Sequence, residues 1–202
     1  MRHAGHAGLA AAIASAVPVA ARMARPEGAL AQDPSLIDGT LQAYFDTILP
    51  GRRVGVTELG NPIHPAAIAG VDPEPGAVEA DALLLANNPL IGFDALAPAL
   101  LADLETRSLA EGGTFLTLDY DARERVCLAG LDFSNPDRAV WEAGAAVPFT
   151  AFCAAANIVN ATKANSVGYR VMGHPGTAPK GYRDFSYRRR LNRGRTKRGN
   201  LA

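Results

Sequence analysis

The chain has 202 residues, 48% of them hydrophobic, and twenty basic residues balance twenty acidic ones. This length suits one domain with tails or two small domains, and the apolar content is sufficient for a core. Its two cysteines, Cys127 and Cys153, form no CxxC pair and are too few for a disulfide framework. We therefore expect both to be buried core thiols.

The charges are distributed unevenly along the chain. Residues 33–162 contain six arginines and eighteen acids, a net charge of −12, whereas residues 163–202 contain eleven basic residues and one acid, a net charge of +10. An acidic body with a basic tail indicates docking of the tail on the body, an acidic partner, or nucleic acid. We interpret residues 188–202 as a solvated, disordered tail and predict no nucleic-acid partner; the alternative is a nucleic-acid-binding arm whose affinity falls with salt.

Residues 1–32 carry an alanine-rich apolar run over 8–21, followed by Ala29-Leu30-Ala31, a small-x-small pattern typical of an export-signal cleavage site. Fourteen apolar residues are too few to cross a bilayer, so we predict no integral membrane span. Two interpretations stay open. The segment is a cleaved signal of an exported protein, or it is a disordered or helical tail of a cytoplasmic one.

The folded region is expected over residues 33–187 and begins with a helix. Asp33-Pro34 provides a cap and a proline at the first helical position, and Leu49-Pro50-Gly51 ends the helix. Its buried face is expected to contain Ile37, Leu41, Tyr44, Phe45 and Ile48. Residues 51–76 hold four prolines and are predicted to form a long loop.

Three further helices are predicted before the longest one: a short helix over 77–86, a helix from the cap candidate Asp94 to the glycines at 112–113, and a helix that starts at Asp119 or Asp121. Residues 114–118 are apolar enough for a strand, but no second β-like run exists to pair with them. The pattern therefore predicts an all-α fold of about five helices with long loops rich in proline and glycine.

The longest predicted helix begins at Asn135-Pro136 and is expected to be the central helix of the core. Pro148 predicts a kink or a break within it. Its apolar stripe is expected to contain Trp141, Ala145, Phe149, Phe152, Ala156 and Val159.

No pattern for a cofactor, metal or nucleophile stands out. The chain lacks a glycine-rich phosphate loop and a GxSxG turn, and His64 and His174 lie far apart in sequence. Asp119, Asp121 and Glu124 are accounted for by helix capping and the helix dipole. We therefore predict no catalytic, cofactor-binding or metal-binding residue in this chain.

Four short motifs occur in a fixed order over residues 35–187, and in this order the chain resembles the small subunit of gluconate 2-dehydrogenase, the subunit 3 family. The motifs are Leu49-Pro50-Gly51, Pro75-Gly76-Ala77, Gly113-Thr114-Phe115-Leu116-Thr117-Leu118-Asp119, and Gly168-Tyr169 with Gly173-His174-Pro175-Gly176. The resemblance implies a non-catalytic accessory subunit without a cofactor of its own. It also implies a large flavin-dependent partner of the glucose–methanol–choline type, which holds FAD and which this subunit helps to mature and, in many relatives, to export.

Residues 168–187 are dense in glycine, proline and aromatic residues, and we predict that they form the partner interface. The expected interface residues are Tyr169, Met172, His174, Pro175, Tyr182 and Phe185. In the alternative account these rings only cover the end of the central helix. Two other functions stay open: a small stand-alone enzyme of a biosynthetic pathway acting through Asp119, Asp121 or His174, and a nucleic-acid-binding protein that uses the basic tail.

Overall fold

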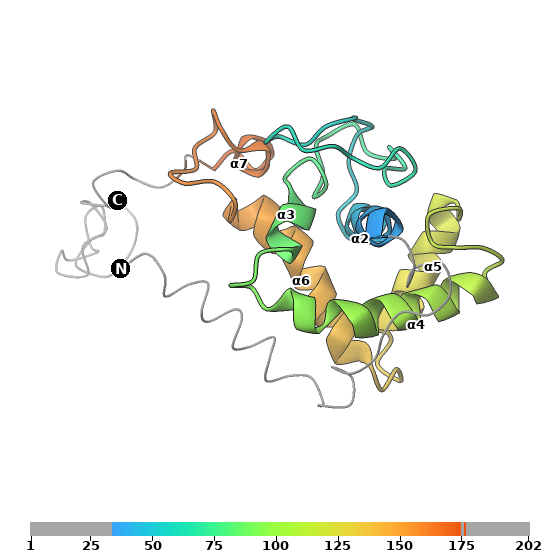
Figure 1. Cartoon of the computed structure of the whole chain (residues 1–202). Coiled ribbons are helices and arrows are strands. Elements are labelled where there is room, and N and C mark those ends of the chain that lie inside the picture. The colour runs from blue at the N-terminus through green and yellow to red at the C-terminus, as the bar shows by residue number, and fades with distance from the viewer. Residues whose placement is uncertain (1–33, 175, 177–202) are drawn as a thin grey trace, which may run out of the picture.

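A computed structural model describes residues 34–174 and Gly176, and this part of the chain is all-α, as predicted (Figure 1). The only β-type pairing in these ranges is an isolated bridge between Val56 and Pro62. The elements, in chain order, are α2 (Pro34–Ile48), α3 (Ala82–Ala86), the 3₁₀ turn η3 (Phe93–Ala95), α4 (Ala97–Ala110), α5 (Tyr120–Leu131), α6 (Arg138–Ala154) and α7 (Val167–Val171).

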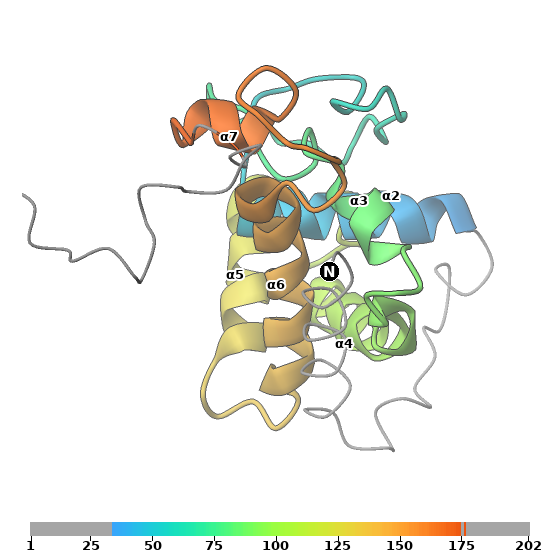
Figure 2. The same ribbon diagram turned by 90° about the vertical axis from the view of Figure 1, so that its left-hand side faces the viewer.

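Helices α5 and α6 lie side by side and antiparallel, and α2 and α4 pack across them (Figures 1 and 2). The long segment between α2 and α3 and the short helix α7 lie together at the end of the molecule where α6 ends (Figure 2). No helix in the described ranges is both long and apolar enough to span a membrane.

The core is centred on aromatic side chains from three elements. Tyr44 and Phe45 of α2 lie against each other, with Trp141 of α6 at the edge of Tyr44 and Phe93 of η3 near Phe45, and all four rings are fully buried. The polar groups of Tyr44 and Trp141 both have hydrogen-bond partners. The Tyr44 hydroxyl donates to the Trp141 carbonyl (3.0 Å), and the Trp141 indole N–H donates to the Asp103 carboxylate (2.7 Å). Gly130 of α5 gives the indole its space, since a Cβ there would overlap the ring.

Helix α6 is the central helix, as predicted, but its start and its buried face differ from the prediction. It begins at Arg138, because Asn135 serves the preceding turn: its Oδ1 accepts from the Asp137 amide (3.1 Å) and its Nδ2 donates to the Gly130 carbonyl (2.6 Å). The helix runs through Pro148 without a break and ends at Ala154.

The predicted apolar stripe of α6 was wrong at Phe149 and Val159, which are 48% and 77% exposed. The buried face consists mostly of small residues, which allow the neighbouring helices to approach closely. These buried residues are Val140, Trp141, Ala143, Gly144, Val147, Pro148, Ala151 and Phe152.

Three other expectations need correction. Helix α3 begins at Ala82 rather than at residue 77, after Asp81 with a left-handed φ of 59°. Asp94 lies inside η3 and does not cap α4, whose N-cap is Leu96. Cys153 is exposed near the end of α6, whereas Cys127 is buried as expected. Asp119, in contrast, caps α5 as predicted, with its Oδ1 accepting from the Ala122 amide (2.8 Å).

Candidate functional site

The segment of residues 51–81, called the 51–81 loop below, is held on the helices by buried polar side chains of α2. Gln42 donates to the Pro62 carbonyl (3.2 Å) and accepts from the His64 amide (2.8 Å). One turn later, Asp46 accepts from the Ala69 amide (2.8 Å). Because residues four apart share one helix face, α2 presents a polar edge along which the backbone of the loop is fixed.

A buried arginine of α5 fixes the same loop from the other side. The Arg123 guanidinium donates to the carbonyls of Ala66 (2.8 Å) and Ala67 (2.9 Å) in the loop. It also donates to the carbonyls of Phe115 (3.0 Å) and Leu116 (2.9 Å), in the turn before α5. One planar cation thus joins two chain segments that carry no regular structure.

Among the carboxylates, Asp46 has the strongest electrostatic effect on this arginine. Burial raises the pKa of the Asp46 carboxyl to about 6, and the amide hydrogen bonds and the positive charge of Arg123 oppose that rise. Burial likewise lowers the pKa of Arg123, while Asp46 acts in the opposite direction. The loop is therefore attached through two buried groups of opposite charge, each of which offsets part of the effect of burial on the other.

Two of the four motifs meet at the ends of the 51–81 loop. The Ala77 amide donates to the Leu49 carbonyl (3.1 Å) and the Arg52 amide donates to the Glu74 carbonyl (2.8 Å). A Cβ on Gly76 would lie 2.6 Å from the Pro50 carbonyl oxygen, so only glycine permits this approach. The Leu49-Pro50-Gly51 and Pro75-Gly76-Ala77 motifs are therefore two halves of one backbone contact.

A pocket of about 460 Å³ opens between the first turns of α2, the outer part of the 51–81 loop and α3. Asp81 at its floor is buried and accepts from the Leu59 amide (3.0 Å) and the Asn61 side chain (2.7 Å). His64 packs its ring on the bare Gly39, where a Cβ would lie 2.9 Å from Cγ, and its Nδ1 accepts from the Ala66 amide (3.2 Å). Asp38 lies at the rim and is exposed.

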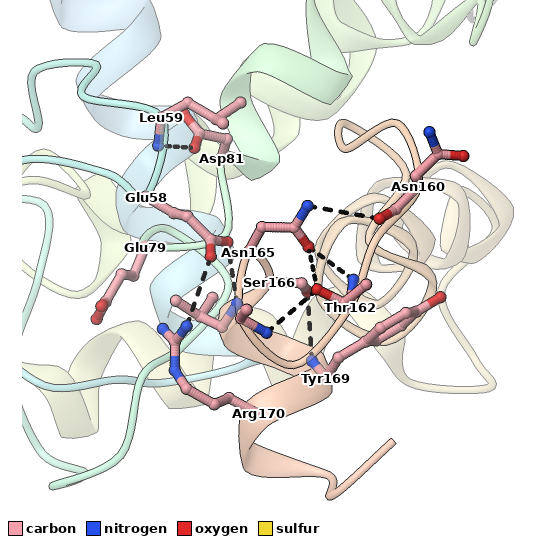
Figure 3. A network of polar contacts seen from close by, with 12 residues as sticks. Glu58, Leu59, Glu79, Asp81, Asn160, Thr162, Asn165, Ser166, Tyr169 and Arg170 are labelled. Carbon is pink, nitrogen blue, oxygen red and sulfur yellow. Dashed lines mark hydrogen bonds and ion pairs between the residues drawn. The ribbon is translucent and has the colours of Figure 1, made fainter. Parts of the chain in front are cut away.

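Helix α7 is docked on the loop by Glu58 (Figure 3). One Glu58 oxygen accepts from the Val167 amide (3.0 Å), and the other lies 3.9 Å from the Arg170 guanidinium. Ser166 caps the helix by accepting from the Tyr169 amide (3.3 Å). Burial raises the pKa of Glu58, and the Val167 amide and Arg170 oppose the rise.

The structure separates the predicted interface residues. Tyr169 is 8% exposed, packs with Ala155 and Ala161, and donates to the Ala154 carbonyl (3.4 Å), so its ring lies inside the protein. Met172 is 44% exposed. His174 is exposed, with its ring centroid 4.5 Å from that of Tyr169. Pro175, Tyr182 and Phe185 lie outside the described residues.

Residues 36–200 match the protein family described as a family of unknown function, DUF5987. The chain belongs to this family. Comparison with curated proteins and with solved structures gives no match. The matched region of the DUF5987 chain includes the 51–81 loop, the pocket, α7 and the basic residues after 187.

The residues weighed as catalytic alternatives have structural roles in this DUF5987 protein. Asp119 caps α5, Asp121 lies in its first turn, and the Nδ1 of His174 accepts from the Gly176 amide (3.0 Å). Over residues 34–174 and 176, no three or more His, Cys, Asp or Glu side chains are grouped so that they could hold a metal ion.

The pocket and its polar supports were not predicted. The sequence feature that could have indicated them is the presence of Gln42 and Asp46 beside the apolar stripe of α2. When polar side chains at such positions are buried, they need hydrogen-bond partners from another segment. The partners are backbone groups some twenty residues further along the chain, and nothing in the sequence identifies them.

Proposed function

We propose that this protein is a non-catalytic accessory subunit that binds a flavin-dependent oxidoreductase of the glucose–methanol–choline type and assists its maturation. FAD belongs to the large partner subunit in this proposal. If residues 1–31 are an export signal, the protein is exported and accompanies its partner. If they are not a signal, it serves a cytoplasmic enzyme.

The observation that carries the proposal is that each motif of the resemblance forms a turn or a close backbone contact within one helical domain. The first two motifs form the contact between Gly51 and Gly76. The third forms the turn whose carbonyls bind Arg123. The fourth brings Gly168 against the Phe152 carbonyl, where a Cβ would overlap the backbone of α6. Motifs with such roles are expected to recur in proteins that share a fold, which supports the comparison with the subunit 3 family.

The surface proposed for the partner is the end of α7 and the residues that follow it. Val171 and Met172 are 42% and 44% exposed at this end, although both are apolar. Tyr169 beneath them holds the helix in place, and Glu58 orients it on the loop. In this arrangement Met172 contacts the partner, whereas Tyr169 is a support; the predicted contributions of Pro175, Tyr182 and Phe185 stand as expectations.

The proposal is tested by purification of the protein from its native host, with identification of the co-purifying chain and measurement of its flavin content. We expect a large flavoprotein with bound FAD, and a lower FAD occupancy when the gene of the present protein is deleted. Recovery of the protein alone, or full FAD occupancy of the candidate enzyme in the deletion strain, would refute the proposal. Met172→Ala should weaken partner binding, and the control for it is Leu109→Ala, which changes another exposed apolar residue on α4 (60% exposed, against 44% for Met172).

A further inference from the structure

We propose that the pocket between α2, the 51–81 loop and α3 binds a guanidinium or primary ammonium group carried on an apolar stem. This inference is independent of the proposed flavoenzyme partner. The volume of the pocket, about 460 Å³, lies within the range of pockets that hold small ligands.

The charge of the lining residues favours a cation. Two carboxylates, Asp38 and Asp81, line the pocket, and its lining includes no lysine or arginine. Neither carboxylate belongs to any ion pair found among the described residues. The N-terminus of α2 contributes a partial positive charge of about half a unit, which two full negative charges outweigh.

The hydrogen-bonding groups of the pocket point to the same ligand. Each oxygen of Asp81 accepts one hydrogen bond and retains capacity for another. The side-chain amide of Asn61 uses its nitrogen on Asp81, which leaves its carbonyl oxygen as an acceptor. A guanidinium offers five donors and no acceptor, and therefore complements the acceptors of Asp81 and Asn61, whereas a carboxylate or phosphate ligand would face like charge.

The remaining wall is apolar and suits the stem of such a ligand. Ile63 is buried, and Leu83 and Leu84 of α3 also line the pocket. Alkyl stems of arginine and lysine pack on apolar surface while their charged ends reach polar groups. An alkylguanidinium would thus place its stem on α3 and its charged end between Asp38 and Asp81.

Two sources could supply this chemistry: the basic run at residues 188–198 of the same chain, or a separate molecule. The pocket wall at Thr57 adjoins Glu58, which binds the start of α7. Arg188 lies twelve positions after Gly176, and an extended chain of that length reaches about 40 Å. The acidic body and the basic run carry opposite charge, which favours such an approach.

The test is an NMR titration of the isotopically labelled full chain. The probe is n-butylguanidinium, and n-butylurea is the neutral probe of similar shape. We expect saturable amide shifts of Asp38, Gly39, Asn61 and His64 with butylguanidinium, and at least about fivefold weaker binding of butylurea. Asp38→Asn should weaken butylguanidinium binding by about fivefold. Asp137→Asn, which removes an exposed carboxylate outside the pocket, should leave it unchanged.

The source is distinguished by a full-length variant in which all seven basic residues of 188–198 are changed to glutamine. If the basic run occupies the pocket, this variant shifts the same amides without any probe and binds butylguanidinium more tightly than the original chain. If its affinity is unchanged, the cation comes from another molecule. Three results would overturn the proposal. These are butylurea binding as tightly as butylguanidinium, equal effects of Asp38→Asn and Asp137→Asn, and no butylguanidinium binding to the original chain or to the glutamine variant.

Discussion

Replacement of Arg123 by methionine removes the buried cation that joins the 51–81 loop to the turn before α5. Three of its four hydrogen bonds, to the carbonyls of Phe115, Leu116 and Ala67, are buried, and the fourth, to Ala66, is partly buried. A buried carbonyl left without a donor costs about 1–3 kcal/mol. Relief of the desolvation of the guanidinium and burial of the methionine offset a part of this cost. We therefore expect the free energy of unfolding to fall by about 4 kcal/mol.

The assay is urea unfolding at pH 7, followed by circular dichroism, with Arg125→Met as the matched control. Arg125 lies half a turn away on α5, is exposed, and forms a surface ion pair with Glu111 (2.8 Å). Its replacement should cost no more than about 1 kcal/mol. Arg123→Lys should recover only part of the loss, since an ammonium cannot reproduce the planar fork of donors. A loss below about 1 kcal/mol for Arg123→Met, equal to that of the control, would show that these carbonyls do not depend on the guanidinium.

Three other predictions concern pH, backbone space and the candidate interface. Because burial raises the pKa of Asp46 to about 6 in the folded state, against an ordinary value of 3.8, the folded state binds the proton more tightly than the unfolded chain. Stability should therefore fall by about 2 kcal/mol as the pH rises from 4 to above 6, and Asp46→Asn should flatten this slope in urea titrations; an unchanged slope would assign it to other groups. Gly76→Ala should lower the unfolding free energy by about 1–3 kcal/mol, whereas Gly55→Ala, with open space around it, should be neutral within about 0.5 kcal/mol; equal effects would contradict the close contact. Tyr169→Ala should lower stability by about 3 kcal/mol, while Met172→Ala should spare the melting temperature and weaken partner binding about tenfold; the reverse pattern, measured by melting and affinity, would refute the assigned roles.

The helices that the sequence identifies well are those with a local start signal. Asp119 caps α5 through a hydrogen bond that spans three residues, and Leu41, Tyr44 and Phe45 occupy the buried face of α2 as their spacing predicts. These features depend on interactions within one or two turns, so the order of residues is sufficient to predict them.

The face of α6 and the pocket depend on partners that are distant in sequence. Gly144 on α6 is buried because Leu100 and Tyr44 pack against it, whereas helical spacing favoured Phe149 and Val159 for the buried face. The pocket combines Asp38 of α2 with His64 and Asp81 of the 51–81 loop, and contacts distant in sequence, such as those of Gln42 and Arg123, hold the loop in place. Periodicity reports which face is apolar, but it does not report which backbone a polar side chain will meet.

The hydrogen bond from Val167 to Glu58 joins residues 109 positions apart and has a consequence for the order of folding. A helix of five residues does not form alone in water, so α7 depends on this carboxylate and on the contact of Gly168 with α6. Closure of so long a loop is entropically costly before other contacts exist. Helix α7 should therefore be the last element to form and the first to open, and its amides should exchange with solvent at a lower free energy than those of α2 or α6.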